Sequence, residues 1–312
     1  MKVSEIASIL EYDYVGEDYD VQGIAYKDEA DEQDIAVIKR KSDILQVKSN
    51  VILSHPILTP VSKTMIFTYD DIGYAIKKIC DVLIQNGVYK DYALPTKFDK
   101  TADEYYVGQN CLIEQDCKIY PNVYIGNYVV IGHNCVIAPN VIIEAGTVIH
   151  DHVHIGSGSR IGADSFYHYY DEKEKLHQFS GVGRTIIGSH VRIGSNCIVQ
   201  RGTISDTIIG NNCMLGNCID VGHDVKIGEN CKIVSQSGIA GNAIIKNNVM
   251  IYGQAGISND VTVGNNVVIK GKTLVSKSVD DNKVVFGLYG RDYYEELRIT
   301  AEIRRKFNRK EE

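Results

Sequence analysis

One histidine of this chain is placed where it could act as a base. His223 follows Asp220 by three positions and directly precedes Asp224. An imidazole titrates near neutral pH and can take a proton from an attacking nucleophile, and either carboxylate could orient the ring or merely lie nearby. A lone histidine can equally be a satisfied surface or core residue. Which of these roles His223 has depends on the secondary structure that positions it.

Three other histidines alternate along the chain and could suggest a metal site. They are His150, His152 and His154. Alternating side chains share one face only in a straight strand, and the repeat described next puts a corner inside this stretch. We therefore expect no metal ion here.

A six-residue repeat runs from Val107 to Val275. Aliphatic residues keep this spacing at Ile113, Ile119, Ile125, Ile131, Ile137, Ile143, Ile149, Ile155 and Ile161, then at Ile187, Ile193 and Val199, and, after one shift, from Ile209 to Val275. Neither a helix nor an alternating strand keeps such a period. A solenoid does, because each repeat buries one aliphatic residue on the next, so we expect a mainly β solenoid.

Two residue types mark the corners of the repeat. Glycine often follows the aliphatic residue, as at Gly126 and Gly132, and asparagine often lies three positions after it, as at Asn122 and Asn134. Both types tolerate positive φ better than other residues. We therefore expect both of them to adopt it where a very short strand ends in a sharp corner.

Six of the eight cysteines share one place in the repeat, two positions before the buried aliphatic residue. They are Cys111, Cys117, Cys135, Cys197, Cys213 and Cys231. We interpret them as small apolar fillers stacked inside the coil. No CxxC pair occurs, which argues against metal ligation and disulfides.

The repeat divides the chain into three parts. Residues 1–100 lack it and have the pattern of a small α/β domain, with helices near Ile6–Leu10 and Ile76–Leu83, the latter ending before Gly87, and strands at Tyr19–Ile24 and Ile35–Ile38. A linker near Tyr92–Asp103 leads into the solenoid, which we place at 101–280. Residues 281–312 form a C-terminal helical segment.

Two segments stand out from the repeat. Residues 163–186, rich in Tyr, His and Lys, interrupt the solenoid and are either a binding element or a harmless insertion. After the repeat, Asp292–Phe307 has the pattern of a charged helix with a basic end. That helix would either pack on a neighbouring subunit or dock an acidic carrier protein.

Bulk properties exclude several classes of protein. The chain has 312 residues, enough for two or three domains, and a net charge of −7 that argues against a nucleic-acid partner. It has no apolar run long enough to span a membrane and no signal peptide at its N-terminus. We therefore expect a soluble, cytoplasmic protein.

Four motifs resemble one enzyme family in the same domain order along the whole chain. The hexads are similar to those of left-handed β-helix acyltransferases. The stretch Ile24–Ala30 followed by Asp34-Ile35, the loop Ile161–Phe166, the segment Thr203–Asn211 and the segment Val221–Val225 resemble UDP-3-O-acylglucosamine N-acyltransferases. The hexads alone are shared by many enzymes, whereas the combination is much more selective.

The resemblance implies a reaction and an assembly. It implies a homotrimer of left-handed β-helices, with active sites in grooves between neighbouring coils, and transfer of an acyl group from acyl carrier protein or acyl-CoA to the amine of a nucleotide-linked sugar. No permanent cofactor is implied, because the phosphopantetheine-linked donor is a substrate. His223 would be the general base, and the backbone N–H of Gly241 would bind the oxyanion. The groove would be lined by Asp220, Asp224, Ser165, Phe166, Tyr167, His168 and Asp260, with the outer-wall histidines nearby.

The chain departs from the family at three places. The aromatic residue that stacks on uracil in the family is missing after Asp34-Ile35, where the chain continues to Lys39 and Arg40, which we assign to the nucleotide. The loop reads Ser165-Phe166-Tyr167-His168 in place of alternating glycine and aromatic residues, and a family histidine is replaced by Asp260. These changes leave the sugar nucleotide and acyl chain open.

Several functions remain to be distinguished. The departures favour a short acyl group and an amino sugar of surface-polysaccharide synthesis, whereas the shared domain order favours the lipid A reaction itself. O-acyl transfer, as in the first acyltransferase of the lipid A pathway, shares the pair His223-Asp224, although that enzyme lacks the N-terminal domain. A solenoid that only binds partners is permitted by the hexads alone.

Overall fold

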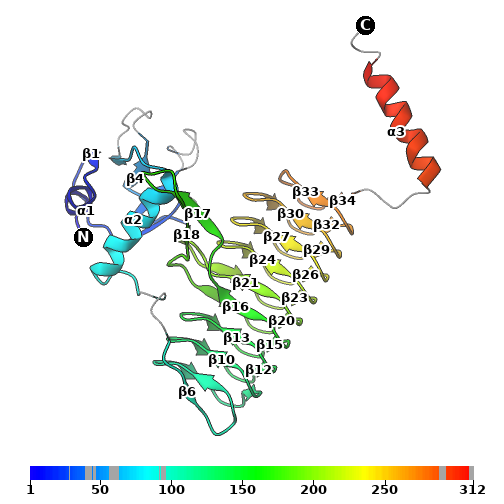
Figure 1. The fold of residues 1–312 in the computed structure, drawn as a ribbon, viewed down its shortest axis with the longest axis horizontal. Coiled ribbons are helices and arrows are strands. Elements are labelled where there is room, and N and C mark those ends of the chain that lie inside the picture. The colour runs from blue at the N-terminus through cyan, green and yellow to red at the C-terminus, as the bar shows by residue number, and fades with distance from the viewer. Residues whose placement is uncertain are drawn as a thin grey trace.

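The computed structural model describes residues 1–27, 29–38, 44, 47–55, 63–90, 92, 96–287 and 293–308. Figure 1 shows a small α/β unit beside a long stack of coils, with the helix α3 (Tyr293–Asn308) apart from the last coils. Within the described ranges, no helix is both long and apolar enough to cross a membrane.

The stack is a parallel β-solenoid with three walls, which confirms the fold expected from the repeat. Tyr124 pairs with Ile142, and Ile142 pairs with Arg160, so one coil takes eighteen residues, or three hexads. Each wall is one sheet whose strands come from successive coils.

The walls are named here by their order within a coil. The first wall contains β6 (Asp99–Lys100), β7 (Tyr106–Val107), β10 (Tyr124–Ile125), β13 (Ile142–Ile143), β16 (Arg160–Ala163), β21 (Ile198–Gln200), β24 (Asp220–Val221), β27 (Gly238–Ile239), β30 (Gly256–Ile257) and β33 (Leu274–Val275). The second wall contains β8 (Leu112–Ile113), β11 (Val130–Ile131), β14 (Val148–Ile149), β19 (Thr185–Ile187), β22 (Thr207–Ile209), β25 (Lys226–Ile227), β28 (Ile244–Ile245) and β31 (Thr262–Val263). The third wall contains β9 (Lys118–Ile119), β12 (Val136–Ile137), β15 (His154–Ile155), β20 (Arg192–Ile193), β23 (Met214–Leu215), β26 (Lys232–Ile233), β29 (Met250–Ile251), β32 (Val268–Ile269) and β34 (Val284–Val285).

Asparagine and glycine mark the corners for different reasons. The asparagines have positive φ, for example 59° at Asn122 and 56° at Asn134, as expected. The expectation for the glycines that follow the aliphatic residues was wrong, because Gly126 and Gly132 are not among the residues with positive φ. A Cβ on Gly126 would lie 2.5 Å from the backbone nitrogen of Ala145. Close approach of the next coil therefore excludes a side chain there.

The six repeat cysteines fill the coil interior. Cys135, Cys197, Cys213 and Cys231 are buried, Cys111 and Cys117 are partly buried, and all six are free thiols. Each thiol also donates a hydrogen bond to a backbone carbonyl of the next coil, for example Cys135 Sγ to His150 O at 3.1 Å. The pattern of the repeat had predicted the packing but not this donor role.

The N-terminal unit is a five-stranded sheet with two helices. Its elements are α1 (Val3–Leu10), β1 (Asp13–Val15), β2 (Gly23–Tyr26), β3 (Asp34–Val37), β4 (Val51–Ser54), β5 (Thr64–Phe67) and α2 (Ile72–Gln85). The strand order is β1-β5-β4-β3-β2, with only β1 antiparallel to its neighbour. Asp71 caps the N-terminus of helix α2, and its carboxylate accepts hydrogen bonds from the N–H groups of Gly73 and Tyr74. The strand expected at Tyr19–Ile24 is found at Gly23–Tyr26, so it starts four residues later and ends two residues later.

The insertion in the solenoid forms a hairpin that packs against the N-terminal unit. Strands β17 (Tyr167–Tyr170) and β18 (Leu176–Phe179) pair antiparallel, and Figure 1 shows them beside α2. The ring of Tyr169 stacks on that of Tyr74 at 5.4 Å, and Tyr169 and Phe179 share a buried cluster with the apolar face of α2. The hairpin therefore joins the unit to the solenoid.

Candidate active site around His223

His223 lies at a corner between the first and second walls. It follows β24 and precedes β25, and the next residue, Asp224, has a φ of 59°, the conformation that asparagine adopts at other corners. An aspartate thus replaces an asparagine at a position that the repeat had already defined. The corner holds the carboxylate and the imidazole side by side.

Asp224 is held by backbone N–H groups from a neighbouring loop. The N–H groups of Thr203 and Ser205 each lie 3.0 Å from its carboxylate, and that of Ile204 lies 3.4 Å away. Its own N–H donates to Thr207 Oγ1 at 2.8 Å. Only 1% of the Asp224 side chain is exposed, so these donors replace water around the carboxylate.

This arrangement selects one tautomer of His223. The Nδ1 atom lies 2.7 Å from Asp224 Oδ2, and a carboxylate surrounded by donors can only accept. Nδ1 therefore carries the proton, and Nε2 carries the lone pair of the neutral ring. Among the described residues no hydrogen-bond partner of Nε2 is found, and Nε2 is not one of the fully buried polar atoms that lack a partner. A base with this geometry can still reach a ligand.

Gly241 lies against the nitrogen that carries the lone pair. A Cβ on Gly241 would fall 2.5 Å from both Nε2 and Cε1 of His223. The backbone there does not need positive φ, which belongs to the next residue, Asn242. Position 241 therefore needs a glycine, because the imidazole occupies the space of any side chain there. The backbone of Gly241 lies beside the base.

The hairpin and the loop before β22 complete the surroundings of the imidazole. The ring of Tyr167 stands edge-on to that of His223, with centroids 5.7 Å apart and planes at 87°. Ser165 Oγ lies 2.9 Å from Thr203 Oγ1, which in turn lies 3.1 Å from His223 Nδ1. Ser165 and Tyr167 are thus brought to the histidine by the fold.

The other residues expected at the site lie further from the imidazole. Asp220 is exposed and contacts Gln200 at 3.4 Å, so Asp224 is the carboxylate bonded to His223. Phe166 and His168 alternate with Tyr167 and point away from it, and 73% of Phe166 is exposed. Lys39 and Arg40, assigned to the nucleotide, lie outside the described residues.

Two tyrosines near this site, Tyr26 of the N-terminal unit and Tyr167 of the hairpin, are affected by the charges of Asp224 and Asp260. Burial raises the pKa of Tyr26 well above its usual range, and the charges of Asp224 and Asp260 act in the same direction. Burial raises the pKa of Tyr167 to about 12, again helped by carboxylates that include Asp224 and Asp260. Both phenols therefore stay neutral and lie near Asp224. Tyr26, Thr203 and Thr207 lie in two of the segments that carried the family resemblance, but they were not assigned to the site from the sequence.

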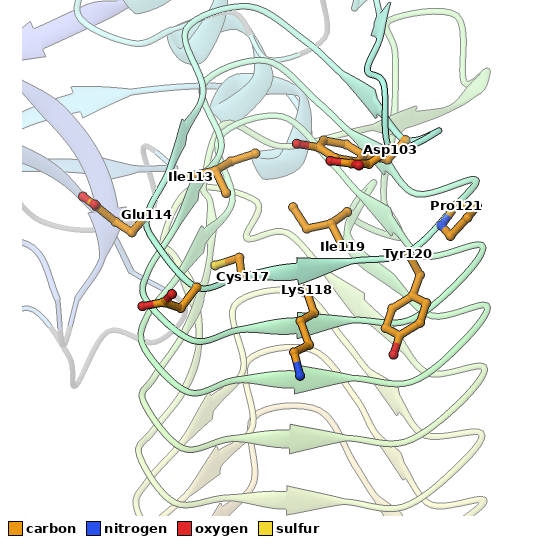
Figure 2. A pocket seen from close by; sticks show the side chains of 10 residues that line it. Asp103, Ile113, Glu114, Cys117, Lys118, Ile119, Tyr120 and Pro121 are labelled. Carbon is orange, nitrogen blue, oxygen red and sulfur yellow. The ribbon is translucent and has the colours of Figure 1, made fainter.

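Three cavities lie away from the imidazole. One of about 470 Å³ lies at the first coil, and Figure 2 shows Ile113, Cys117 and Ile119 around it. A second of about 500 Å³ lies between the N-terminal unit and the solenoid, next to Arg184 and Asp206. A third of similar size is lined by Phe98 and Tyr124 on the first wall. None of the three is lined by His223.

The alternating histidines are part of the outer surface of the coils. His152 stacks on His190 from the next coil, with centroids 4.7 Å apart. His154 points outward from the third wall, where burial and the neighbouring Arg192 lower its pKa. Among the described residues, no group of three or more His, Cys, Asp or Glu side chains could hold a metal ion.

The solenoid also matches a known repeat family. The family described as bacterial transferase hexapeptide (six repeats) matches residues 105–139, 130–166 and 206–241. The matched stretches lie within the solenoid and agree with its six-residue repeat.

Two similar curated proteins carry the same name. The chain is 42% identical over 127 residues to a UDP-3-O-acylglucosamine N-acyltransferase of Coxiella burnetii, which is 39% of this chain and 37% of that enzyme. It is 40% identical over 79 residues to the enzyme of the same name from Sinorhizobium fredii, which is 25% of this chain and 22% of that enzyme. The aligned stretches thus span 37% and 22% of the length of these two relatives.

Among solved structures, one similar chain is a UDP-N-acetylglucosamine acyltransferase of Francisella novicida. The TM-score is 0.49 at 24% sequence identity, over 58% of this chain and 67% of that chain.

Proposed function

We propose that this chain is an N-acyltransferase that moves an acyl group from a phosphopantetheine-linked thioester to the amine of a nucleotide-linked amino sugar. The observation that carries the proposal is the pair formed by His223 Nδ1 and Asp224 Oδ2 at 2.7 Å. It leaves Nε2 free to accept a proton beside the backbone of Gly241. The names of the matched relatives support the same reaction class.

The proposed step balances without a cofactor. The neutral amine attacks the thioester carbonyl carbon while Nε2 of His223 takes one of its protons, and a tetrahedral oxyanion forms. The N–H of Gly241 donates to that oxyanion. The carbon–sulfur bond then breaks, the carbonyl re-forms as an amide, and the imidazolium returns its proton to the departing thiolate. The products are one amide and one thiol.

The acceptor we favour first is a UDP-linked 3-O-acylglucosamine. Both matched curated relatives carry that substrate in their name, which outweighs the missing uracil-stacking aromatic residue. The donor is acyl carrier protein or acyl-CoA, and the chain length of the acyl group is open. A dideoxy amino sugar with a short acyl group is the second acceptor class to test.

We further propose that the working form is a homotrimer with its sites at the boundaries between subunits. Support comes from an aliphatic column on the outer face of the second wall, where the residue just before the buried aliphatic residue of each strand points outward. The column comprises Leu112, Val130, Val148, Ile186 and Ile208, and Lys226 then separates it from Ile244. Monomeric proteins rarely leave an apolar run like the one from Leu112 to Ile208 open to water.

A two-part experiment tests the proposed reaction. Thiol release from acyl-CoA and acyl carrier protein donors is measured with UDP- and dTDP-linked amino sugars, and the amide product is identified by mass spectrometry. The same sugars are screened by thermal shift, since a ligand at a hundred times its Kd adds ~2.7 kcal/mol to stability. Stabilisation without thiol release by any donor would instead identify a binding solenoid, and an ester product would identify an O-acyltransferase.

A further inference from the structure

The hairpin formed by β17 and β18 lies between the solenoid and the N-terminal unit, and the proposed reaction gives it no role. One face of β17 turns toward the solenoid and α2, where Tyr167 is half-buried and Tyr169 is buried. The other face, with His168 and Tyr170, is exposed. The alternation of a strand therefore aims Tyr167 inward, at the corner that carries His223.

Tyr167 is fixed from the N-terminal side. A Cβ on Gly73, in the first turn of α2, would lie 3.1 Å from Cε1 of Tyr167 and 3.0 Å from Cβ of Tyr169. Lys78 on the same helix lies 3.1 Å from Asp70 and 3.5 Å from Glu172 at the tip of the hairpin. Helix α2 thus packs against the Tyr167 ring. The absence of a side chain at Gly73 allows this close approach.

The imidazole is then enclosed on several sides. Asp224 and Thr203 contact Nδ1, Gly241 lies against Nε2, and Tyr167 stands edge-on at 5.7 Å. Only 9% of the His223 side chain remains exposed. Of these residues, Tyr167 belongs to the insertion. Its raised pKa keeps the phenol neutral, so it does not act as a second base.

We propose that Tyr167 is a positioning residue that holds the His223 imidazole and keeps bulk water away from it, so that an amine and not water receives the acyl group. This inference rests on the proposed function, because it assigns a role within that reaction. Water competes with any acceptor for a thioester, and its exclusion from the base favours the bound nucleophile. The insertion is therefore the part of the fold that protects the acyl donor from hydrolysis.

The test compares four variants by two readouts. Tyr167→Ala removes the ring, Tyr167→Phe keeps it without the hydroxyl, Tyr169→Leu loosens the hairpin without removing the Tyr167 ring, and Tyr170→Ala changes an exposed side chain on the same strand. The first readout is the ratio of thioester hydrolysis to amide formation. The second is the rate at which diethyl pyrocarbonate modifies His223, followed by mass spectrometry, which needs no substrate.

The expected result is specific to the ring. Because an edge-on ring contact has a modest energy, Tyr167→Ala should raise the ratio of hydrolysis to amide formation and the rate of His223 modification about two- to tenfold. Tyr167→Phe and Tyr170→Ala should behave like the wild type in both readouts. Tyr169→Leu should lower the thermal midpoint and change both readouts less than Tyr167→Ala does.

Three outcomes would overturn the proposal. They are unchanged readouts in a folded Tyr167→Ala variant, an equal change in Tyr169→Leu, and a change in Tyr167→Phe as large as that in Tyr167→Ala. If the wild type forms no amide with any acceptor, the proposed function fails by itself. The modification rate of His223 then still decides whether Tyr167 covers the imidazole.

Discussion

The imidazole of His223 occupies the space that a side chain on Gly241 would need. A Cβ on this glycine would lie 2.5 Å from Nε2, far inside the ordinary contact distance. The two residues belong to successive coils, eighteen positions apart, so the parallel register places one directly beside the other. The geometry makes the glycine as much a part of the site as the histidine.

Gly241→Ala is therefore expected to displace the imidazole and abolish most of the activity. Loss of one oxyanion donor alone costs about 10²–10³ in kcat, and the displaced base would add to that loss. Gly238→Ala is the matched control, since nothing lies within 4 Å of its added Cβ. Steady-state kinetics of both variants check this, and equal activities would show that the space beside Nε2 is not used.

His223→Ala is expected to leave the fold intact and to lower turnover at least ~100-fold, as the loss of a general base does. His190→Ala serves as the control, because His190 is an exposed corner residue with a φ of 60° that stacks on His152. Circular dichroism reports on the fold and thiol release on turnover. Full activity of the His223 variant would remove this residue from the mechanism.

Asp224→Asn should impair both stability and turnover. An amide cannot accept from the N–H groups of Thr203 and Ser205 and from Nδ1 of His223 while placing its own NH₂ among those donors. We expect a loss of about 1–3 kcal/mol in the free energy of unfolding. Turnover should also fall, because the tautomer of His223 is no longer selected.

The control for this substitution is Asp116→Asn. Asp116 has a φ of 62° at an equivalent corner, but its side chain is exposed at the first coil. Denaturant titration and thiol release are measured for both variants. If the two variants lose equal stability and activity, the backbone donors around Asp224 have no special role.

The repeat allowed the solenoid, its buried residues and the corner positions to be predicted, because each depends on neighbours six or eighteen positions away. The partner of His223 could be narrowed only to Asp220 or Asp224. The backbone N–H groups that donate to the Asp224 carboxylate belong to Thr203, Ile204 and Ser205. These residues lie where the six-residue repeat shifts, between Val199 and Ile209. That shift was visible in the sequence and was a usable signal for a functional loop.

The role of the insertion could not be predicted in the same way. Its contact with α2 joins residues about a hundred positions apart, such as Lys78 and Glu172, and no local period encodes that pairing. The glycines were misjudged for a related reason. Their requirement comes from the backbone of the next coil and not from their own φ.

Asp206 gives a prediction about pH. Burial alone would raise its pKa, but the hydrogen bonds from the Arg184 side chain and N–H outweigh burial and hold the pKa below the usual 3.8. A lowered pKa means that the folded state favours the charged form. This contribution to stability is complete above the unfolded value and is lost as pH falls through the folded one.

The wild type should therefore exceed Asp206→Asn in stability by a constant amount above about pH 5, and the difference should shrink below pH 3.8. Denaturant titrations between pH 3 and pH 7 check this. The exposed Asp103→Asn variant controls for general charge effects. A difference that stays constant down to pH 3 would mean that Arg184 does not stabilise the Asp206 carboxylate.

The aliphatic column on the second wall gives a prediction about assembly. Val148 lies between Val130 and Ile186 in that column and points outward, far along the chain from His223. Val148→Asp would place a charge on the proposed subunit interface, where burial without a partner is costly. We expect this variant to fold but to shift from trimer to monomer in light scattering.

The same variant connects assembly with catalysis. If the sites lie between subunits, the monomeric Val148→Asp protein should lose most thiol release although its own His223 corner is unchanged. Val136→Asp, on the outer face of the third wall, is the matched control because it adds the same charge to a different wall. A trimer that persists in Val148→Asp would remove the second wall from the interface. A fully active monomer would show that one chain alone completes the site.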